Sequence, residues 1–171
     1  MKIQVYADGV LTYGDETFRC ALGRGGISTV KKEGDGATPT GLYPLLRLYW
    51  RTDKVASIHS DLPRQTISAD DGWCDDPKHP SYNRAVKLPF GASHEKMWRD
   101  DDLYDLVIEI GHNNNPVIPG AGSAVFIHVA TPDYAPTEGC IALAKNDLRT
   151  LLPKWSTETK IEIFETRRPS A

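Results

Sequence analysis

Apolar and polar residues alternate in several short segments of this chain, as they do in strands that bury one face. Residues 2–6 and 10–13 show this pattern, and Asp8-Gly9 between them is a hairpin-turn sequence. Alternation or an unbroken apolar run also predicts strands at residues 17–22, 42–50, 104–110, 123–129 and 160–165, and a further strand that starts at 141. The chain is therefore predicted to be mainly β and to open as a meander of three strands.

One segment has the spacing of a helix instead. Leu148, Leu151 and Leu152 recur at helical intervals, and Pro153 ends the pattern. This predicts a single clear helix at residues 145–152, directly after the strand that starts at 141. The fold class is then mainly β, within the α+β class.

In two regions the apolar residues follow neither the period of a strand nor that of a helix. Residues 51–102 mix aromatic, acidic and histidine residues, which predicts a long irregular insertion that binds a polar ligand. Residues 23–36 are rich in glycine and charge, but they match neither the Walker spacing nor the dinucleotide fingerprint. We expect these residues to form a surface loop.

Size and charge narrow the class of protein. A chain of 171 residues fits one domain that spans residues 1–171. The net charge of −3 and the scattered Lys and Arg residues argue against a nucleic-acid partner. No apolar run is long enough for a membrane span, and residues 1–9 show neither the apolar core nor the cleavage site of a signal peptide.

The candidate chemistry lies near the end of the chain. Cys140 follows Gly139, and His128 stands at the end of the predicted strand 123–129. A cysteine attacks as the thiolate, so it needs a base such as histidine to take its proton. The backbone N–H groups of Gly139 and Cys140 are natural donors to a developing oxyanion, and Thr137 would hold the turn. This mechanism requires that the strands of His128 and Cys140 be neighbours.

Other roles are open for the same residues. Free cysteines are often inert core residues, and a strand histidine can be one too. A zinc site from Cys74, His79, His128 and Cys140 would have irregular ligand spacing. A Cys20–Cys74 disulfide would leave Cys140 free.

The segment Thr137-Glu138-Gly139-Cys140, with His128 before it, resembles the [Ser/Thr]-His-Gly-Cys motif of the L,D-transpeptidases, the family with a YkuD-type catalytic domain. Residues 37–45 are similar to the Thr-Pro-x-Gly segment of that family, and the resemblance extends over residues 23–152. Three features depart from the pattern. Glu138 stands where most members have histidine, Ala142 stands where many have arginine, and the segment between His128 and Thr137 is short.

The resemblance implies a β-sandwich domain that acts as a cysteine acyltransferase on peptidoglycan stem peptides. Donor and acceptor stem peptides would be its partners, and no metal or cofactor would be used. Members of the family are also acylated by carbapenems, which implies a β-lactam adduct at Cys140. The substrate implies a location in the periplasm or cell envelope.

We expect the substrate to contact residues of the insertion and of the loops near the motif. These candidates are Trp73, Tyr82, Arg99, His112, Asn113 and Glu138. Arg99 could instead form a structural ion pair with neighbouring acids, and Trp73 could be a packing anchor. Two alternative functions remain: a cysteine carboxypeptidase or endopeptidase on the same peptides, and a non-catalytic cell-wall binding domain.

Overall fold

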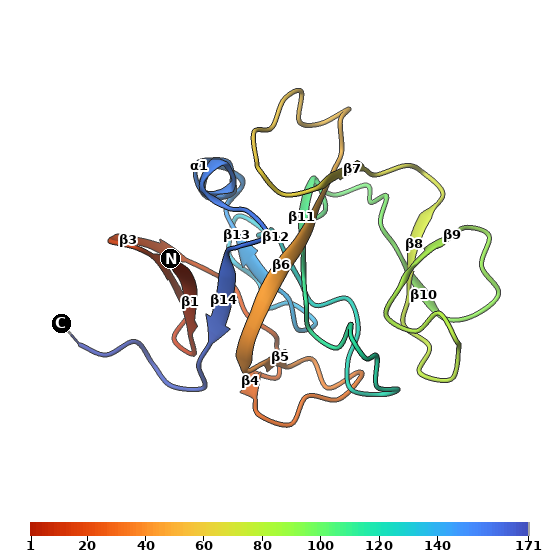
Figure 1. Ribbon diagram of the computed structural model, residues 1–171, viewed down its shortest axis with the longest axis horizontal. Coiled ribbons are helices and arrows are strands. Elements are labelled where there is room, and N and C mark those ends of the chain that lie inside the picture. The colour runs from red at the N-terminus through yellow and green to blue at the C-terminus, as the bar shows by residue number, and fades with distance from the viewer. Residues whose placement is uncertain (171) are drawn as a thin grey trace.

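A long strand, β6 (Gly41–Trp50), joins the two halves of the main sheet in the computed structural model, which describes residues 1–170 (Figure 1). The first part of β6 pairs with β14 (Lys160–Ile163), and the second part pairs with β11 (Leu106–Ile110). Because both halves share this strand, the sheet can bend there and pack its halves against each other.

The first half contains the predicted meander. The strands β1 (Lys2–Tyr6), β2 (Val10–Tyr13) and β3 (Glu16–Arg19) pair in sequence order, and β1 also pairs in parallel with β14. Beyond β3, Ala21 forms an antiparallel bridge with Ala142 at the opposite end of the sheet. This bridge brings the two ends of the sheet together.

The second half carries the strands next to the candidate site. Antiparallel to β11 runs β12 (Phe126–Val129), which pairs in parallel with β13 (Ile141–Leu143), while the short β7 (Arg64–Thr66) pairs with β6. The helix α1 (Lys145–Leu151) and the 3-10 turn η1 (Leu152–Lys154) follow β13. No helix among residues 1–170 is long and apolar enough to cross a membrane.

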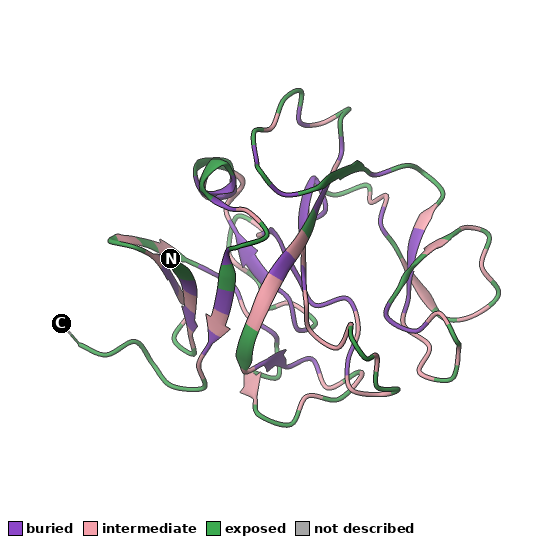
Figure 2. Cartoon of the chain, viewed as in Figure 1, coloured by how far each residue is buried: buried purple, intermediate pink, exposed green. Residues whose placement is uncertain are grey.

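The main hydrophobic core lies between the two halves of the sheet. It takes Ile3 and Ile161 from one half, Ile127 and Ile141 from the other, and Trp155 from the segment after η1, all fully buried (Figure 2). Because side chains alternate along β12, Ile127 faces this core while Phe126 and His128 face the other side. The candidate histidine therefore points away from the main core.

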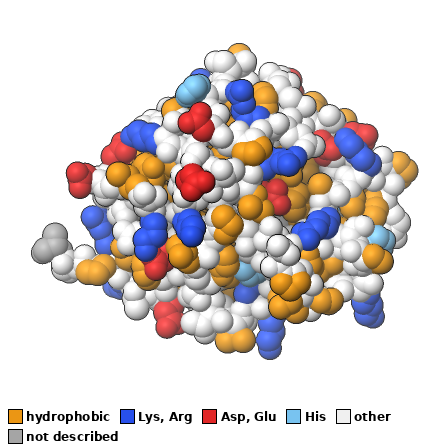
Figure 3. All heavy atoms as spheres, in the orientation of Figure 1, with side chains coloured by type: hydrophobic (Ala, Val, Ile, Leu, Met, Phe, Trp, Pro, Cys, Tyr) orange, Lys and Arg blue, Asp and Glu red, His pale blue; other side chains and the backbone are white. Residues whose placement is uncertain are grey.

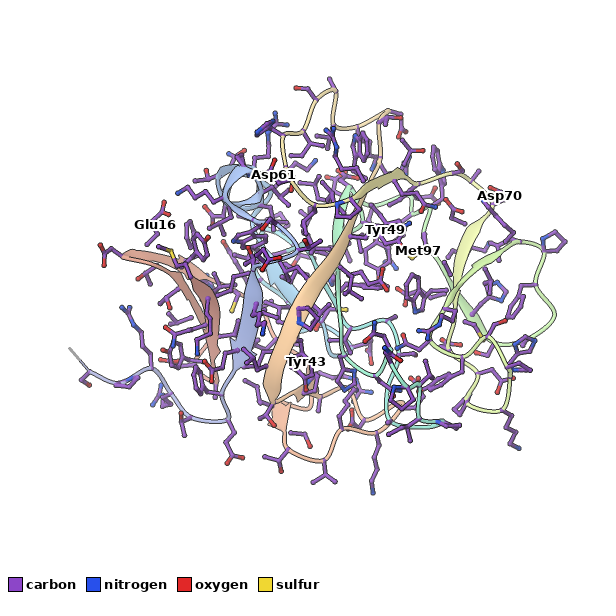
Figure 4. All side chains as sticks on the ribbon, in the orientation of Figure 1. Glu16, Tyr43, Tyr49, Asp61, Asp70 and Met97 are labelled. Atoms are coloured by element: carbon purple, nitrogen blue, oxygen red, sulfur yellow. The ribbon has the colours of Figure 1, made fainter. Side chains whose placement is uncertain are left out.

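A second apolar cluster attaches the insertion to that outer side. The insertion forms its own three-stranded sheet, in which β8 (Asp71–Cys74) lies between β9 (Ala85–Lys87) and β10 (His94–Lys96). Tyr49, Trp73, Met97 and Phe126 pack together in the cluster, and Tyr49 and Met97 lie between β6 and this sheet in Figure 4. A further short pair, β4 (Ile27–Ser28) with β5 (Thr38–Pro39), holds the glycine-rich loop.

The predicted class, mainly β with a helix after the cysteine strand, is confirmed. Residues 51–102 are less irregular than we expected, since they contain β7 to β10. The strand predicted at 123–129 starts at Phe126, because Ala124 has a positive φ of 52° and its N–H donates to the Asn83 side chain instead of a neighbouring strand. On the face shown in Figure 3, Lys and Arg side chains are dispersed among Asp and Glu.

Candidate active site

Adjacent parallel strands place His128 and Cys140 on one face. Ile127 pairs with Ile141, and His128 pairs with Ala142, so Cys140 lies immediately before the paired segment of β13. Since side chains alternate along each strand, His128 and Cys140 both turn away from the main core. Both residues line one cleft of about 540 Å³. The adjacency that the mechanism required is present.

The backbone fixes the tautomer of the histidine. The Nδ1 atom of His128 lies 2.9 Å from the carbonyl oxygen of Val129. A carbonyl can only accept a hydrogen bond, so Nδ1 carries the proton and Nε2 of the neutral ring keeps its lone pair. The edge of the ring also packs against Tyr104, with 5.3 Å between the ring centres. His128 is therefore oriented as a base.

The thiol of Cys140 is held by the start of β12. Its Sγ atom accepts the Phe126 N–H at 3.4 Å and donates to the Ala124 carbonyl at 3.2 Å. The bond to Ala124 directs the thiol proton to the backbone in this resting arrangement. Catalytic hydrogen bonds are often absent before substrate binds, so a rotation of the thiol is needed to bring its proton to His128.

Burial keeps both groups neutral. It raises the pKa of the Cys140 thiol to about 12, and the charge of Glu95 adds to this effect. Burial also lowers the pKa of His128 to about 4, despite the hydrogen bond to Val129 that favours the charged ring. Near neutral pH the resting pair is thus a thiol and an imidazole, and the thiol must lose its proton during the attack.

The turn before the cysteine depends on a glycine. Gly139 has a φ of 137°, and a Cβ at this position would lie 2.8 Å from the Ala37 carbonyl oxygen. Thr137 Oγ1 accepts the Gly139 N–H at 3.1 Å and donates to the Cys140 carbonyl at 2.7 Å. Thr137 therefore holds the turn, and it also occupies one of the two N–H groups that we expected to face an oxyanion.

Two walls of different origin line the cleft, together with a loop that supplies Lys31, Glu33 and Gly34. The strands and the loop before β13 supply His128, Cys140 and the segment from Ala135 to Gly139. The insertion supplies a set of charged and polar side chains: Asp75, His94, Glu95 and Arg99. Tyr104 connects the walls, because its hydroxyl donates to Glu95 while its ring packs against His128. Burial raises the pKa of the Glu95 carboxyl, and the bond from Tyr104 opposes that shift.

A comparison with protein families gave a match over most of the chain. The model of the YkuD family, described as the L,D-transpeptidase catalytic domain, matches residues 2–163. The chain belongs to this family. Searches among curated proteins and among solved structures gave no match. The match confirms the resemblance to the L,D-transpeptidase family. L,D-transpeptidase domains act on the peptides of peptidoglycan, in the cell wall.

Two of the predicted substrate residues line the cleft of this L,D-transpeptidase domain. Arg99 lies in the wall of the insertion and forms two hydrogen bonds with Asp101, at 2.9 and 2.7 Å. This is the ion pair with a neighbouring acid that we considered for it. Glu138 lies at the rim with its side chain 80% exposed and pairs with Arg24 at 2.9 Å. Its carboxylate thus points to solvent.

The other four predicted substrate residues lie outside the residues that line the cleft. Trp73 is buried against Phe126, and its indole N–H donates to Asn83. Tyr82 is also buried, and its hydroxyl donates to Glu33 and accepts the N–H of Gly122. These contacts are those of packing anchors.

His112 and Asn113 support a loop behind the site. The ring of His112 packs edge-on against Tyr43, and burial lowers its pKa to about 4. The side-chain N–H groups of Asn113 donate to the carbonyls of Ile118 and Gly122. Both residues thereby shape the loop that precedes β12.

Sequence reasoning missed several of the charged residues that line the cleft. Lys31 and Glu33 come from the loop that we expected to lie on the surface, and Glu95 comes from the insertion. The only signal in the sequence was the density of charge around residues 31–36. Their burial depends on loops that are distant in the chain, which a periodic pattern cannot reveal.

The residues considered for a zinc site and for a disulfide are not brought together by the fold. Among residues 1–170, no group of three or more His, Cys, Asp or Glu side chains is arranged to hold a metal ion, so the zinc set is not assembled. Cys20, Cys74 and Cys140 are all buried free thiols, and no Cys20–Cys74 disulfide forms.

Proposed function

We propose that this L,D-transpeptidase domain is a cysteine acyltransferase that works on peptidoglycan stem peptides through a thioester on Cys140. The observation that carries the proposal is the placement of Cys140 and His128 in one cleft, with Nδ1 of His128 bound to the Val129 carbonyl. Membership of the family supports the choice of substrate. The cell envelope is the compartment in which such a substrate lies.

The first half-reaction starts from the neutral pair. Nε2 of His128 takes the thiol proton as Sγ attacks the donor carbonyl, and the same proton passes to the leaving amine. A thioester remains on Cys140. In the second half-reaction the amine of an acceptor stem peptide attacks the thioester, His128 takes a proton from that amine, and the proton returns to the sulfur. Water in place of the amine would give hydrolysis.

The test separates these outcomes. Purified protein is incubated with tetrapeptide muropeptides, and the products and the intact protein are followed by mass spectrometry. We expect an acyl adduct on the wild type, cross-linked dimers, and neither for Cys140→Ala. Shortened monomers without dimers would assign the carboxypeptidase function. Retention on cell walls without an adduct or product would assign the non-catalytic binding function and refute the proposal.

A β-lactam gives a second measurement. A carbapenem presents an acyl group to the same thiol, so exposure should add the mass of the drug to the wild type. Cys140→Ser should remain unmodified. An adduct on both proteins would place the reactive group elsewhere in the chain.

A further inference from the structure

A buried lysine lies in the cleft beside the nucleophile. The side chain of Lys31 is 8% exposed, although lysines nearly always keep the ammonium group in water. It lines the cleft together with Gly139 and Cys140. A Cβ placed on Gly139 would lie 3.4 Å from Nζ, so the ammonium group lies next to the residue that precedes the nucleophile.

The surroundings of Lys31 hold the ammonium group in this place. A Cβ on Gly122 would lie 3.1 Å from Cγ and from Cε of Lys31, so the glycine leaves room for the side chain. Nζ donates to Asp35 Oδ1 at 2.5 Å, and the same oxygen accepts the Ala37 N–H. This is the only hydrogen bond of Nζ within residues 1–170, and an ammonium group has three protons. Two N–H groups are left for a ligand.

Acyl transfer on Cys140 needs donors at this point. The tetrahedral intermediate carries a negative oxygen beside the backbone of the nucleophile, and donors placed there lower the barrier. The Gly139 N–H is bound to Thr137 Oγ1. The Cys140 N–H has no partner among the described residues. The backbone of the turn thus offers one free donor where two are usual.

We propose that Lys31 is a catalytic residue whose ammonium group, together with the Cys140 N–H, binds the oxyanion. This inference deepens the proposed function and depends on Cys140 as its nucleophile. When Sγ bonds to the acyl carbon, the electron pair of the C=O bond moves to oxygen and the thiol proton moves to His128. Collapse restores the C=O bond, breaks the bond to the leaving group and delivers the proton to that group. Lys31 keeps its proton throughout.

Two simpler roles must be separated from this one. The charge of Lys31 favours the thiolate of Cys140, and its bond to Asp35 holds the loop. Alkylation of Cys140 by iodoacetamide needs the thiolate but forms no oxyanion. Acylation by p-nitrophenyl acetate needs the thiolate and forms an oxyanion. The ratio of the two rates therefore isolates the oxyanion, whatever the natural substrate is.

The experiment measures both rates at Cys140 by peptide mass mapping, in wild type, Lys31→Met and Lys32→Met. Lys32 is the exposed neighbour, so its substitution removes the same charge from the same loop. We expect Lys31→Met to acylate on the order of 10²-fold more slowly, as for the loss of one oxyanion donor. Its alkylation should fall much less than its acylation, since the charge of Lys31 is the weakest of the influences on the thiol pKa. Lys32→Met should change neither rate, and Lys31→Arg should recover part of the acylation.

Several outcomes would overturn the inference. Equal losses of acylation and alkylation would assign Lys31 to the thiolate or to the loop. Unchanged acylation, or a wild type that is acylated by neither ester nor stem peptide, would also refute it. Should Lys31→Met fail to fold, Lys31→Gln carries the same comparison. A Lys31-dependent reaction with the ester but none with stem peptides would keep the inference and refute the proposed substrate.

Discussion

The two walls of the cleft are built in different ways. His128 and Cys140 stand on or beside β12 and β13, whose inner faces belong to the main core and whose pairing is continuous. Glu95 and Arg99 stand on or just after β10, a strand of three residues in a separate sheet. That sheet is attached to the strands through the second apolar cluster. One wall is fixed by backbone pairing and the other by side-chain packing.

This difference assigns a different role to each wall. Proton transfer tolerates little displacement, and the wall with paired strands carries the proposed base and nucleophile. The wall of the insertion carries Asp75, Glu95 and Arg99, whose charges can tune reactivity and select a substrate. Tyr104 is the point at which one wall affects the other, since it contacts both His128 and Glu95.

The largest effect should come from the strand wall. Replacing His128 with glutamine removes the base, and we expect acylation of Cys140 to fall on the order of 10³-fold, within the usual range for general base catalysis. The rate of adduct formation with stem peptide or ester measures it. The matched control is His59→Gln, because His59 is exposed and away from the cleft. A loss below about tenfold would show that another group takes the thiol proton.

A large effect on stability should come from the anchor of the insertion wall. Trp73 is 4% exposed and packs against Tyr49 and Phe126. Trp73→Ala should lower the free energy of unfolding by about 3–5 kcal/mol, as for other buried tryptophans. Urea unfolding measures this loss, and Trp73→Phe should retain part of the packing. An unchanged unfolding free energy with weaker binding of stem peptides would instead make Trp73 a substrate residue.

The sequence predicted the strand wall better than the insertion wall, and the difference has a physical reason. Strands β12 and β13 are buried throughout and stand in the sequence as nearly unbroken apolar runs, so the strands that carry or adjoin His128 and Cys140 could be located. The strands of the insertion are equally short, but they mix charged residues and glycine with few apolar ones and so leave no apolar run in the sequence. Their positions depend on side-chain contacts such as the bonds of Asn83 to the loop around residues 112 and 113.

The dependence on tertiary contacts also explains why the sequence did not identify Lys31 and Glu95 as residues of the cleft. A charged residue in a glycine-rich loop is normally solvated, and nothing local distinguishes one that is buried. Lys31 is covered by Gly122 and Gly139, which are far from it in the chain. The sequence could name Cys140 and His128 as candidates for the chemistry, but the positions of the charged groups around them depend on tertiary packing.

A smaller effect should measure the coupling between the walls. The charge of Glu95 raises the pKa of Cys140, second to burial, so Glu95→Gln should lower that pKa and speed alkylation by iodoacetamide several-fold at neutral pH. The pKa of Glu95 is itself raised above 4.5 by burial. At a pH below the pKa of Glu95, its carboxyl is neutral in the wild type as well. The ratio of the Glu95→Gln alkylation rate to the wild-type rate should therefore approach one at low pH and increase as the pH rises through that pKa.

The rate profile against pH checks this coupling, with Glu158→Gln as the exposed control. In the wild type the alkylation rate should still be rising at pH 9, because the thiol pKa is raised to about 12. A rate that reaches its plateau near neutral pH would mean that the resting sulfur is already ionised. A gain for Glu95→Gln that is the same at all pH values would mean that its charge is not the cause.

The smallest effect belongs to the rim. Glu138 and Arg24 form an exposed ion pair, so Glu138→Gln should change the free energy of unfolding by less than about 1 kcal/mol. The effect of Glu138→Gln on catalysis tests the comparison of the two walls. Glu138 lies on the strand wall, but it is charged, like the side chains of the insertion wall. If it contacts the acceptor amine, the KM for the acceptor should rise while acylation by the donor stays constant. The partition between dimers and hydrolysis products measures this, with Arg24→Gln as the matched control that frees the carboxylate. An unchanged KM for the acceptor in Glu138→Gln would leave recognition of the amine to the insertion wall, where Glu95 and Asp75 line the cleft.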